Sequence, residues 1–116
     1  MRIDVVTLFP DFVAQCAGIG VIGRAQERGL LAVHAWNPRD YATDAYRRVD
    51  ERPFGGGPGM VMLIGPLCAA LQAARAAAAE PVKTSYSSQQ GARLDQDKVA
   101  ELAQRERLIL VWRRYE

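Results

Sequence analysis

Five consecutive residues, Gly55 to Gly59, form the segment whose composition is hardest to explain as ordinary structure. Every position is glycine except for one proline at 58. Glycine accepts backbone angles that are closed to other residues and lets a ligand approach the main chain closely. Met60 and Val61 follow, so the Lys-Ser/Thr pair of a nucleotide-binding P-loop is missing. Spacing alone leaves two interpretations open: a flexible turn, or a loop shaped around a substrate.

Three arginines precede this glycine segment. Arg47, Arg48 and Arg52 flank Asp50 and Glu51. Guanidinium groups bind RNA phosphates and stack on unpaired bases. A solvated run whose charges pair with one another has the same composition. The residues by themselves do not decide between these two interpretations.

Two further polar segments each follow an expected strand: Ser88 to Gly91, and Arg113 to Glu116. Ligands of open α/β sheets bind outside the carboxyl ends of the strands. A carboxylate such as Glu116 could bind an ammonium group there, and Tyr115 could stack on an aromatic ring. An ordinary polar strand exit is the alternative.

Histidine- and cysteine-based chemistry is not expected. His34 is the single histidine and falls in an apolar segment, so a Ser-His-Asp or Cys-His arrangement is disfavoured. Cys16 and Cys68 are far apart in helix-like apolar surroundings. Their spacing fits neither a metal site nor a disulfide framework, so we expect two buried thiols and no metal.

The composition predicts one folded domain. The chain has 116 residues, of which 49% are hydrophobic, and this is ample for a core. A formal charge of +2 neither requires nor excludes a nucleic-acid partner. No apolar run approaches the ~20 residues of a membrane-spanning helix. The amino-terminal segment is strand-like and lacks the features of a signal peptide, so we expect a cytoplasmic protein without membrane association.

Short β-branched stretches alternate with helical ones, which predicts an α/β fold with a mostly parallel sheet flanked by helices. The expected strands cover residues 3–8, 30–36, 61–63, 82–87 and 108–111. The expected helices start at a cap on Asp11, run over 21–28 to a left-handed Gly29, run over 67–79 with Pro66 in the first turn, and start at Asp95. No regular structure is expected between 37 and 59, and such a long irregular stretch in a compact domain is usually functional or disordered.

Several segments resemble, in the same order, the bacterial tRNA (guanine-N1)-methyltransferase family. They are LFP at 8–10, GRA at 23–25, RRVDERPFGGGPGMVM at 47–62, Gln90-Gly91 and Arg114-Tyr115-Glu116. The glycine-proline segment and its preceding Val-Asp-x-x-Pro are the most specific of these.

The resemblance implies a SPOUT-class methyltransferase domain, whose carboxyl-terminal half is tied in a trefoil knot. Residues 1–116 would be the amino-terminal part of that domain, ending before the knot is completed and lacking the carboxyl-terminal domain that helps to hold tRNA. Family members act as homodimers with the active site at the subunit interface. They take the methyl group from S-adenosylmethionine and transfer it to N1 of the guanosine 3′ of the tRNA anticodon.

The resemblance also implies residue roles. The cofactor-binding residues would be Tyr86, Ser87, Ser88, Gln89, Gln90, Gly91, Arg113, Tyr115 and Glu116. The residues beside the substrate RNA would be Gly57, Pro58, Gly59, Arg48, Arg52 and Arg114. The family's general base and the arginine that stabilises charge on the guanine carbonyl oxygen would lie beyond position 116. No catalytic residue is therefore expected within the chain, and the isolated chain is not expected to catalyse methyl transfer.

Two places depart from the family pattern. Thr84, Ser85, Ser87 and Gln89 stand where the family has apolar residues and a proline. We expect this strand to be central in a parallel sheet, where an unpartnered hydroxyl costs on the order of 1–3 kcal/mol. Trp112-Arg113 replaces Cys-Gly, so a long charged side chain would stand where bare main chain should meet the ligand.

Two other functions remain open from the sequence. One is a non-catalytic RNA-binding module that uses the three arginines and the glycine segment. The other is a dimerisation fragment that folds only by pairing with another subunit. A well-folded monomer at every concentration in size-exclusion chromatography would contradict the second.

Titration with tRNA at two salt concentrations tests the RNA-binding module. A complex held by arginine–phosphate contacts should weaken steeply as salt rises, because RNA-bound counterions are released on binding. A chain that forms no complex even at low salt is not an RNA-binding module.

Overall fold

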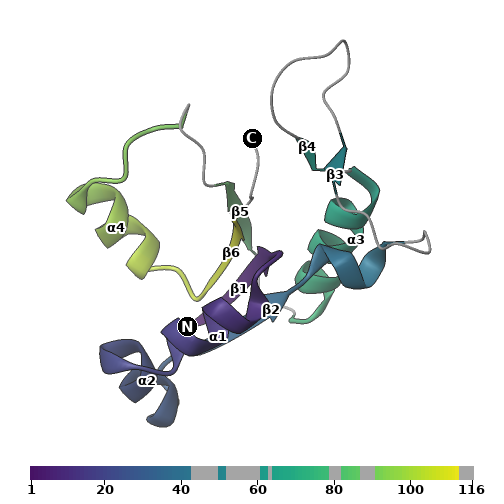
Figure 1. Ribbon diagram of the computed structural model, residues 1–116. Helices are drawn as coiled ribbons and strands as arrows, with labels where there is room; N and C mark the ends of the chain where they lie inside the picture. Colours follow the sequence, from purple (N-terminus) through teal and green to yellow (C-terminus); the bar gives the residue numbers. More distant parts are fainter. Residues whose placement is uncertain (43–49, 52–60, 63, 79–81, 87–90, 113–116) are drawn as a thin grey trace.

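Four of the expected strand segments pair into a four-stranded parallel sheet in the order β2-β1-β6-β5 (Figure 1). Its strands are β1 (Arg2–Thr7), β2 (Ala32–Trp36), β5 (Lys83–Tyr86) and β6 (Arg107–Trp112). The computed structural model describes residues 1–42, 50–51, 61–62, 64–78, 82–86 and 91–112. The predicted α/β class and the parallel sheet are confirmed.

The two central strands, β1 and β6, carry the core. Their register pairs Ile3 with Leu108, and runs on to Thr7 and Trp112. Val6, Ile109 and Val111 are buried on one face of the sheet. Near-continuous apolar runs are what strands covered on both faces require, and VV in β1 and LILV in β6 supply them.

Helices lie against both faces of the sheet. On one face, α3 (Ile64–Ala76) buries Ala70 and Ala74 completely against Val6 and Ile109. On the other, α1 (Pro10–Ala17) packs over β2, and α4 (Gln96–Ala103) stands near β6. The small α3 residues let the helix approach the sheet closely. Two shorter elements, α2 (Gly20–Glu27) and the 3₁₀ helix η1 (Pro38–Tyr41), flank this core.

The expected central position of the strand near Tyr86 is wrong. In the described sheet β5 is an edge strand, paired with β6 alone. Its polar side chains therefore need not be buried between two strands. The hydroxyl of Thr84 accepts a hydrogen bond from Arg75 of α3 at 2.8 Å, and Ser85 is half-buried. The free-energy cost of an unpartnered hydroxyl, expected from the sequence, therefore does not arise at Thr84.

Three local expectations also need correction. The first helix begins at Pro10, and Asp11 lies inside its first turn without capping it. The 37–59 stretch is not wholly irregular, because it contains η1 and the two-residue β3 (Asp50–Glu51). The segment expected as a strand at 61–63 forms β4 (Val61–Met62), which pairs antiparallel with β3 outside the main sheet.

Both cysteines are exposed, so the expectation of buried thiols is wrong. In α1 the buried residue is Ala17, one position after Cys16. In α3 the buried residues are Ala70 and Ala74, which lie on a different side of the helix from Cys68. A helix that packs on one sheet face buries only one stripe, and both thiols fall outside it.

Close packing between the end of α1 and α2 explains the glycine of the Gly23-Arg24-Ala25 motif. A Cβ atom on Gly23 would lie 2.5 Å from the carbonyl oxygen of Gly18. Gln26 of α2 connects α1 to β2 through its side chain. Its Nε2 donates to the carbonyl oxygen of Ala17 at 2.6 Å, and its Oε1 accepts from the main-chain amide of Val33 at 3.2 Å. Gly29 ends the helix with φ at 72°, as predicted.

Replacing Gly23 with alanine should lower the free energy of unfolding by about 1–3 kcal/mol, because the new methyl group overlaps rigid main chain. Urea unfolding measures the change. Gly65→Ala is the matched control: Gly65 lies in α3 with open space where the methyl group of an alanine would stand, and a helical alanine is favoured by up to about 1 kcal/mol. Equal effects of the two substitutions would contradict the packing argument.

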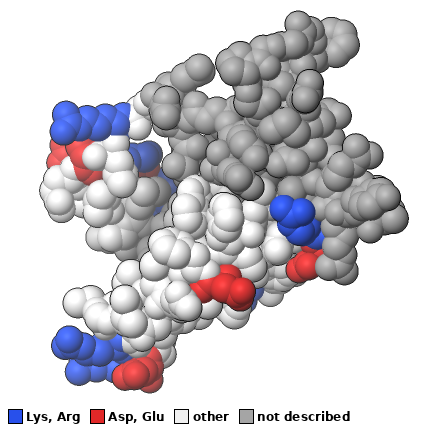
Figure 2. Space-filling view, viewed as in Figure 1, with Lys and Arg blue, Asp and Glu red and all other residues white. Residues whose placement is uncertain are grey.

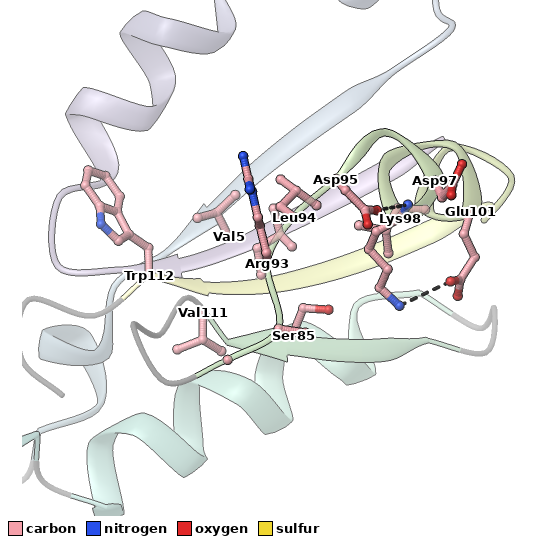
Figure 3. A pocket seen from close by; sticks show the side chains of 14 residues that line it. Val5, Ser85, Arg93, Leu94, Asp95, Asp97, Lys98, Glu101, Val111 and Trp112 are labelled. Atoms are coloured by element: carbon pink, nitrogen blue, oxygen red, sulfur yellow. Dashed lines mark hydrogen bonds and ion pairs between the residues drawn. The ribbon is translucent and has the colours of Figure 1, made fainter.

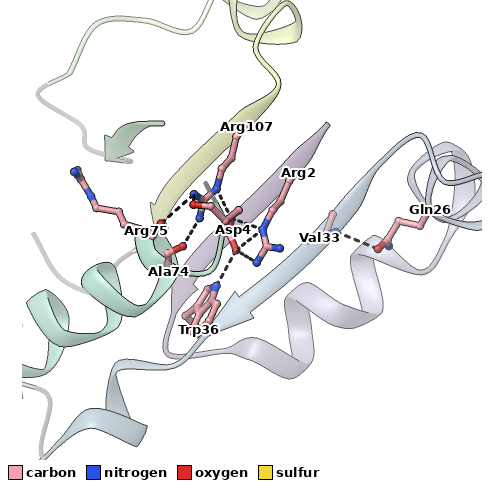
Figure 4. Close-up of polar contacts among 9 residues, drawn as sticks. Arg2, Asp4, Gln26, Val33, Trp36, Ala74, Arg75 and Arg107 are labelled. Carbon is pink, nitrogen blue, oxygen red and sulfur yellow. Dashed lines mark hydrogen bonds and ion pairs between the residues drawn. The ribbon is translucent and has the colours of Figure 1, made fainter. Parts of the chain in front are cut away.

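A buried charge cluster joins the amino-terminal ends of the central strands to α3 (Figure 4). Asp4 of β1 is fully buried and accepts hydrogen bonds from Arg2 at 3.0 Å, from Trp36 at 2.9 Å and from Arg107 at 3.2 Å. Arg107 of β6 is itself buried. One carboxylate thus connects β1, β2 and β6.

Arg107 also closes the carboxyl-terminal end of α3. Its guanidinium donates to the carbonyl oxygens of Ala74, Arg75 and Ala78, the last two at 3.2 and 3.1 Å. The final carbonyls of a helix have no partner within the helix, and they carry partial negative charge that favours a cation. Arg107 therefore donates hydrogen bonds both to the carboxylate of Asp4 and to the carbonyl oxygens at the end of α3.

Asp4→Asn should destabilise the fold by about 3 kcal/mol or more, because it leaves the buried Arg107 charge without its counter-ion. Burial favours the neutral acid, but hydrogen bonds from Arg2, Trp36 and Arg107 outweigh it, and the pKa of Asp4 lies below its usual value. A lowered folded-state pKa gives stability that is present above the unfolded value of about 3.9 and is lost as pH falls through the folded value.

Urea unfolding between about pH 6 and pH 2.5 tests this linkage. The native chain should lose stability below about pH 4, and part of that loss should be absent in Asp4→Asn. Asp97→Asn makes the same chemical change at an exposed site on α4. If both variants behaved like the native chain, the cluster would not stabilise the fold.

Candidate functional site

The carboxyl ends of β5 and β6 lie side by side. Tyr86, the last residue of β5, is in register with Val111, and β6 continues to Trp112. The two segments that the sequence predicts as cofactor walls follow these two ends directly. The structure thus brings the starting points of both segments to one edge of the sheet.

Many of the predicted site residues fall outside the described part of the chain. They are Ser87, Ser88, Gln89, Gln90, Arg113, Arg114, Tyr115 and Glu116, together with Arg48, Arg52, Gly57, Pro58 and Gly59. Tyr86 and Gly91 are described. Gly91 and Trp112 both line one cavity.

That cavity, of about 1230 Å³, lies between the sheet and α4 (Figure 3). Val5, Leu110 and Ser85 form its sheet wall, and Leu94 and Leu102 stand on the side of α4. No residue of α4 is buried. The volume exceeds the ~300–1,000 Å³ of ordinary ligand pockets, so the helix stands well away from the sheet.

Charges on α4 are largely engaged with one another. The carboxylate of Asp95 caps the helix by accepting from the amide of Lys98 at 2.8 Å. Glu101 accepts from Arg105 at 2.9 Å and from Lys98 at 3.2 Å. Hydrogen bonds from Arg105 and then Lys98 hold the pKa of Glu101 below its usual value. These pairs are solvent-exposed and support the helix more than they define a ligand site.

Three aromatic side chains meet at the carboxyl edge, beside the cavity. The ring of Trp112 lies 5.9 Å from that of Phe9 and 5.5 Å from that of Phe12, with interplanar angles of 50° and 52°. Tilted aromatic pairs at this spacing are favourable. We refer to Phe9, Phe12 and Trp112 as the aromatic cluster. The sequence marked Trp112 only as a departure and gave no sign of these contacts, because its partners come from the other end of the chain.

Charged side chains do not form a continuous basic surface on the described part of the face in Figure 2. Lys and Arg side chains there stand beside Asp and Glu. In the described ranges, no group of three or more His, Cys, Asp or Glu residues is placed to hold a metal ion. His34 is an exposed residue of β2. None of the helices in those ranges is long and apolar enough to cross a membrane.

Comparison with known proteins gives one family and several similar relatives. A family model described as tRNA (Guanine-1)-methyltransferase TrmD matches residues 1–116. Proteins named tRNA (guanine-N(1)-)-methyltransferase from Xylella fastidiosa and Xanthomonas campestris are each 63% identical over the whole chain. The chain spans 44% and 46% of their respective lengths, which is less than half.

A solved structure has the same fold. The crystal structure of tRNA (m1G37) methyltransferase from Aquifex aeolicus superposes with a TM-score of 0.86 at 29% identity. The match covers all of this chain and 52% of that one. The parallel sheet and its flanking helices are therefore those of this class of methyltransferase.

Proposed function

This chain belongs to the tRNA (Guanine-1)-methyltransferase TrmD family, and we propose that it works in an enzyme that methylates N1 of the guanosine 3′ of the tRNA anticodon. The methyl donor in this proposal is S-adenosylmethionine. The observation that carries the proposal is the adjacency of the ends of β5 and β6. Gln90-Gly91 follows the first end and Arg114-Tyr115-Glu116 follows the second, so the two family motifs start from neighbouring points.

The described residues fit a ligand at this edge. Bound S-adenosylmethionine supplies an electrophilic methyl group. Paired parallel strands that end together expose main-chain groups beyond their last bonds, which is where ligands of α/β sheets bind. Ser85 offers a hydroxyl, and Val5 and Leu110 offer an apolar wall next to the same edge. Tyr86, Ser87, Ser88, Gln89, Gln90 and Gly91 would form one side of the site, and Arg113, Tyr115 and Glu116 the other.

The RNA side of the proposal rests on other residues. Gly57, Pro58 and Gly59 would lie beside the target base, with bare main chain against it. Arg48, Arg52 and Arg114 would bind RNA phosphates. N1 of guanine must lose its proton as the methyl group arrives, so the reaction needs a general base and a group that stabilises charge on the carbonyl oxygen. We assign neither role to a residue of these 116.

The assembly is part of the same proposal. The enzyme would be a cytoplasmic homodimer whose active site lies at the subunit interface. The isolated chain would then bind the methyl donor weakly and transfer no methyl group, because the rest of the site would be missing.

Amide NMR spectra of the labelled chain, titrated with S-adenosylmethionine, test the proposal. Resonances of Ser85, Gly91 and Trp112 should shift, while those of Gly23 and Gly29 at α2 should not. Calorimetry of the same mixture should give little heat. ATP, which shares the adenosine but lacks the methionine, is the control ligand. An absence of shifts at millimolar concentration, or equal shifts with ATP, would contradict the proposal.

Glu116→Gln should weaken this binding several-fold, because the neutral amide loses the charge attraction to the ligand's ammonium group. Glu106→Gln is the matched control: Glu106 is exposed at the opposite end of β6. A Glu116→Gln chain that bound as tightly as the native one would remove Glu116 from the site and leave the other assignments to the NMR data.

A further inference from the structure

The aromatic cluster ties the end of β6 to the start of α1. Thr7 and Trp112 form the last pair of the β1–β6 register. Thr7 is fully buried, and its hydroxyl accepts a hydrogen bond from the amide of Phe9 at 3.1 Å. That bond fixes the turn that leads from β1 into α1, so the position of Phe9 follows from the position of the strand.

The direction of the Trp112 side chain follows from the alternation of side chains between the two faces of the sheet. Residues two apart along β6 point to the same face, so Trp112 shares the face of Leu110, which lines the cavity. The helix α1 begins on that face at Pro10. Phe12 lies one turn along from Phe9, so both rings present themselves to Trp112 from the same side of the helix. Phe9 and Phe12 therefore hold the ring of Trp112, the last residue of β6, against α1.

The three rings are only partly buried, unlike the side chains of the hydrophobic core. Phe9, Phe12 and Trp112 are 43%, 54% and 38% exposed, respectively. Trp112 lines the cavity together with Gly91. The cluster thus contains the residue after which the second proposed wall starts, and Tyr86, after which the first wall starts, is in register with the neighbouring Val111.

We infer that Trp112, held by Phe9 and Phe12, is a positioning residue for the methyl-donor site. It fixes the end of β6 at the carboxyl edge, next to the proposed methyl-donor site. This inference rests on the proposed function and adds a residue that acts through its neighbours without touching the ligand. Without the ring contacts, the Thr7–Trp112 pair of the register frays, and the fraction of molecules in which β6 is paired up to its last residue falls. Apparent affinity falls in proportion to that fraction.

The test measures the apparent Kd for S-adenosylmethionine by NMR titration, at a temperature where every variant is folded. Trp112→Ala should raise the Kd about tenfold, because it removes two ring contacts. Trp112→Phe should stay within about twofold of the native chain, because a ring remains. Phe12→Ala keeps β6 intact and removes one contact, and about threefold is expected. Hydrogen exchange at Val111 and Trp112 should be faster in both alanine variants.

Gly23→Ala is the control for stability alone. It destabilises the α1–α2 contact without touching the cluster, and should leave the Kd unchanged. If Trp112→Ala and Phe12→Ala bound the ligand as the native chain does, the positioning role would be wrong while the proposed function stood. If the native chain showed no binding at all, both would fall together. Loss of affinity in Trp112→Phe equal to that in Trp112→Ala would also overturn the role of the ring.

Discussion

The buried pair formed by Asp4 and Arg107 is the interaction on which the rest of the fold depends. It joins the first strand of the chain to the last described one, 103 positions apart in sequence. Through the same two side chains, Trp36 ties in β2 and the end of α3 is capped. A lone buried charge is costly, so the pair stabilises the arrangement only when all of these elements are in place. The cluster therefore favours one alignment of β1, β2, β6 and α3 over alternatives.

Fixing this end of the sheet has consequences at the other end. The β1–β6 register set near Asp4 continues without interruption to Thr7 and Trp112. The carboxyl ends of β5 and β6 are then neighbours because β5 pairs in register with β6. A parallel sheet places all of its carboxyl ends along one edge, so the charge cluster at one edge is structurally linked to the proposed ligand site at the other. The aromatic cluster closes that second edge with apolar contacts.

The two faces of the sheet are covered unequally. Alanines let α3 lie directly on Val6 and Ile109. On the other face, α4 buries none of its residues and leaves a cavity of about 1230 Å³ over Val5 and Leu110. The Xylella and Xanthomonas relatives are more than twice as long as this chain, and the fold is shared with a methyltransferase of which it covers 52%. The family assignment rests on the whole chain, whereas donor, substrate and partner remain proposals.

The sequence by itself determined the local elements. Short apolar runs predicted β1, β2 and β6, Gly29 ended α2 in the left-handed region, and Asp95 capped α4. Each of these signals depends only on residues a few positions apart. The family motifs can likewise be recognised from the sequence alone. Tertiary structure alone decided the rest: that β5 is an edge strand, that both thiols are exposed, that Gly23 meets Gly18, and that Trp112 meets Phe9 and Phe12. These outcomes depend on which distant segments share a surface, and no short-range pattern encodes that.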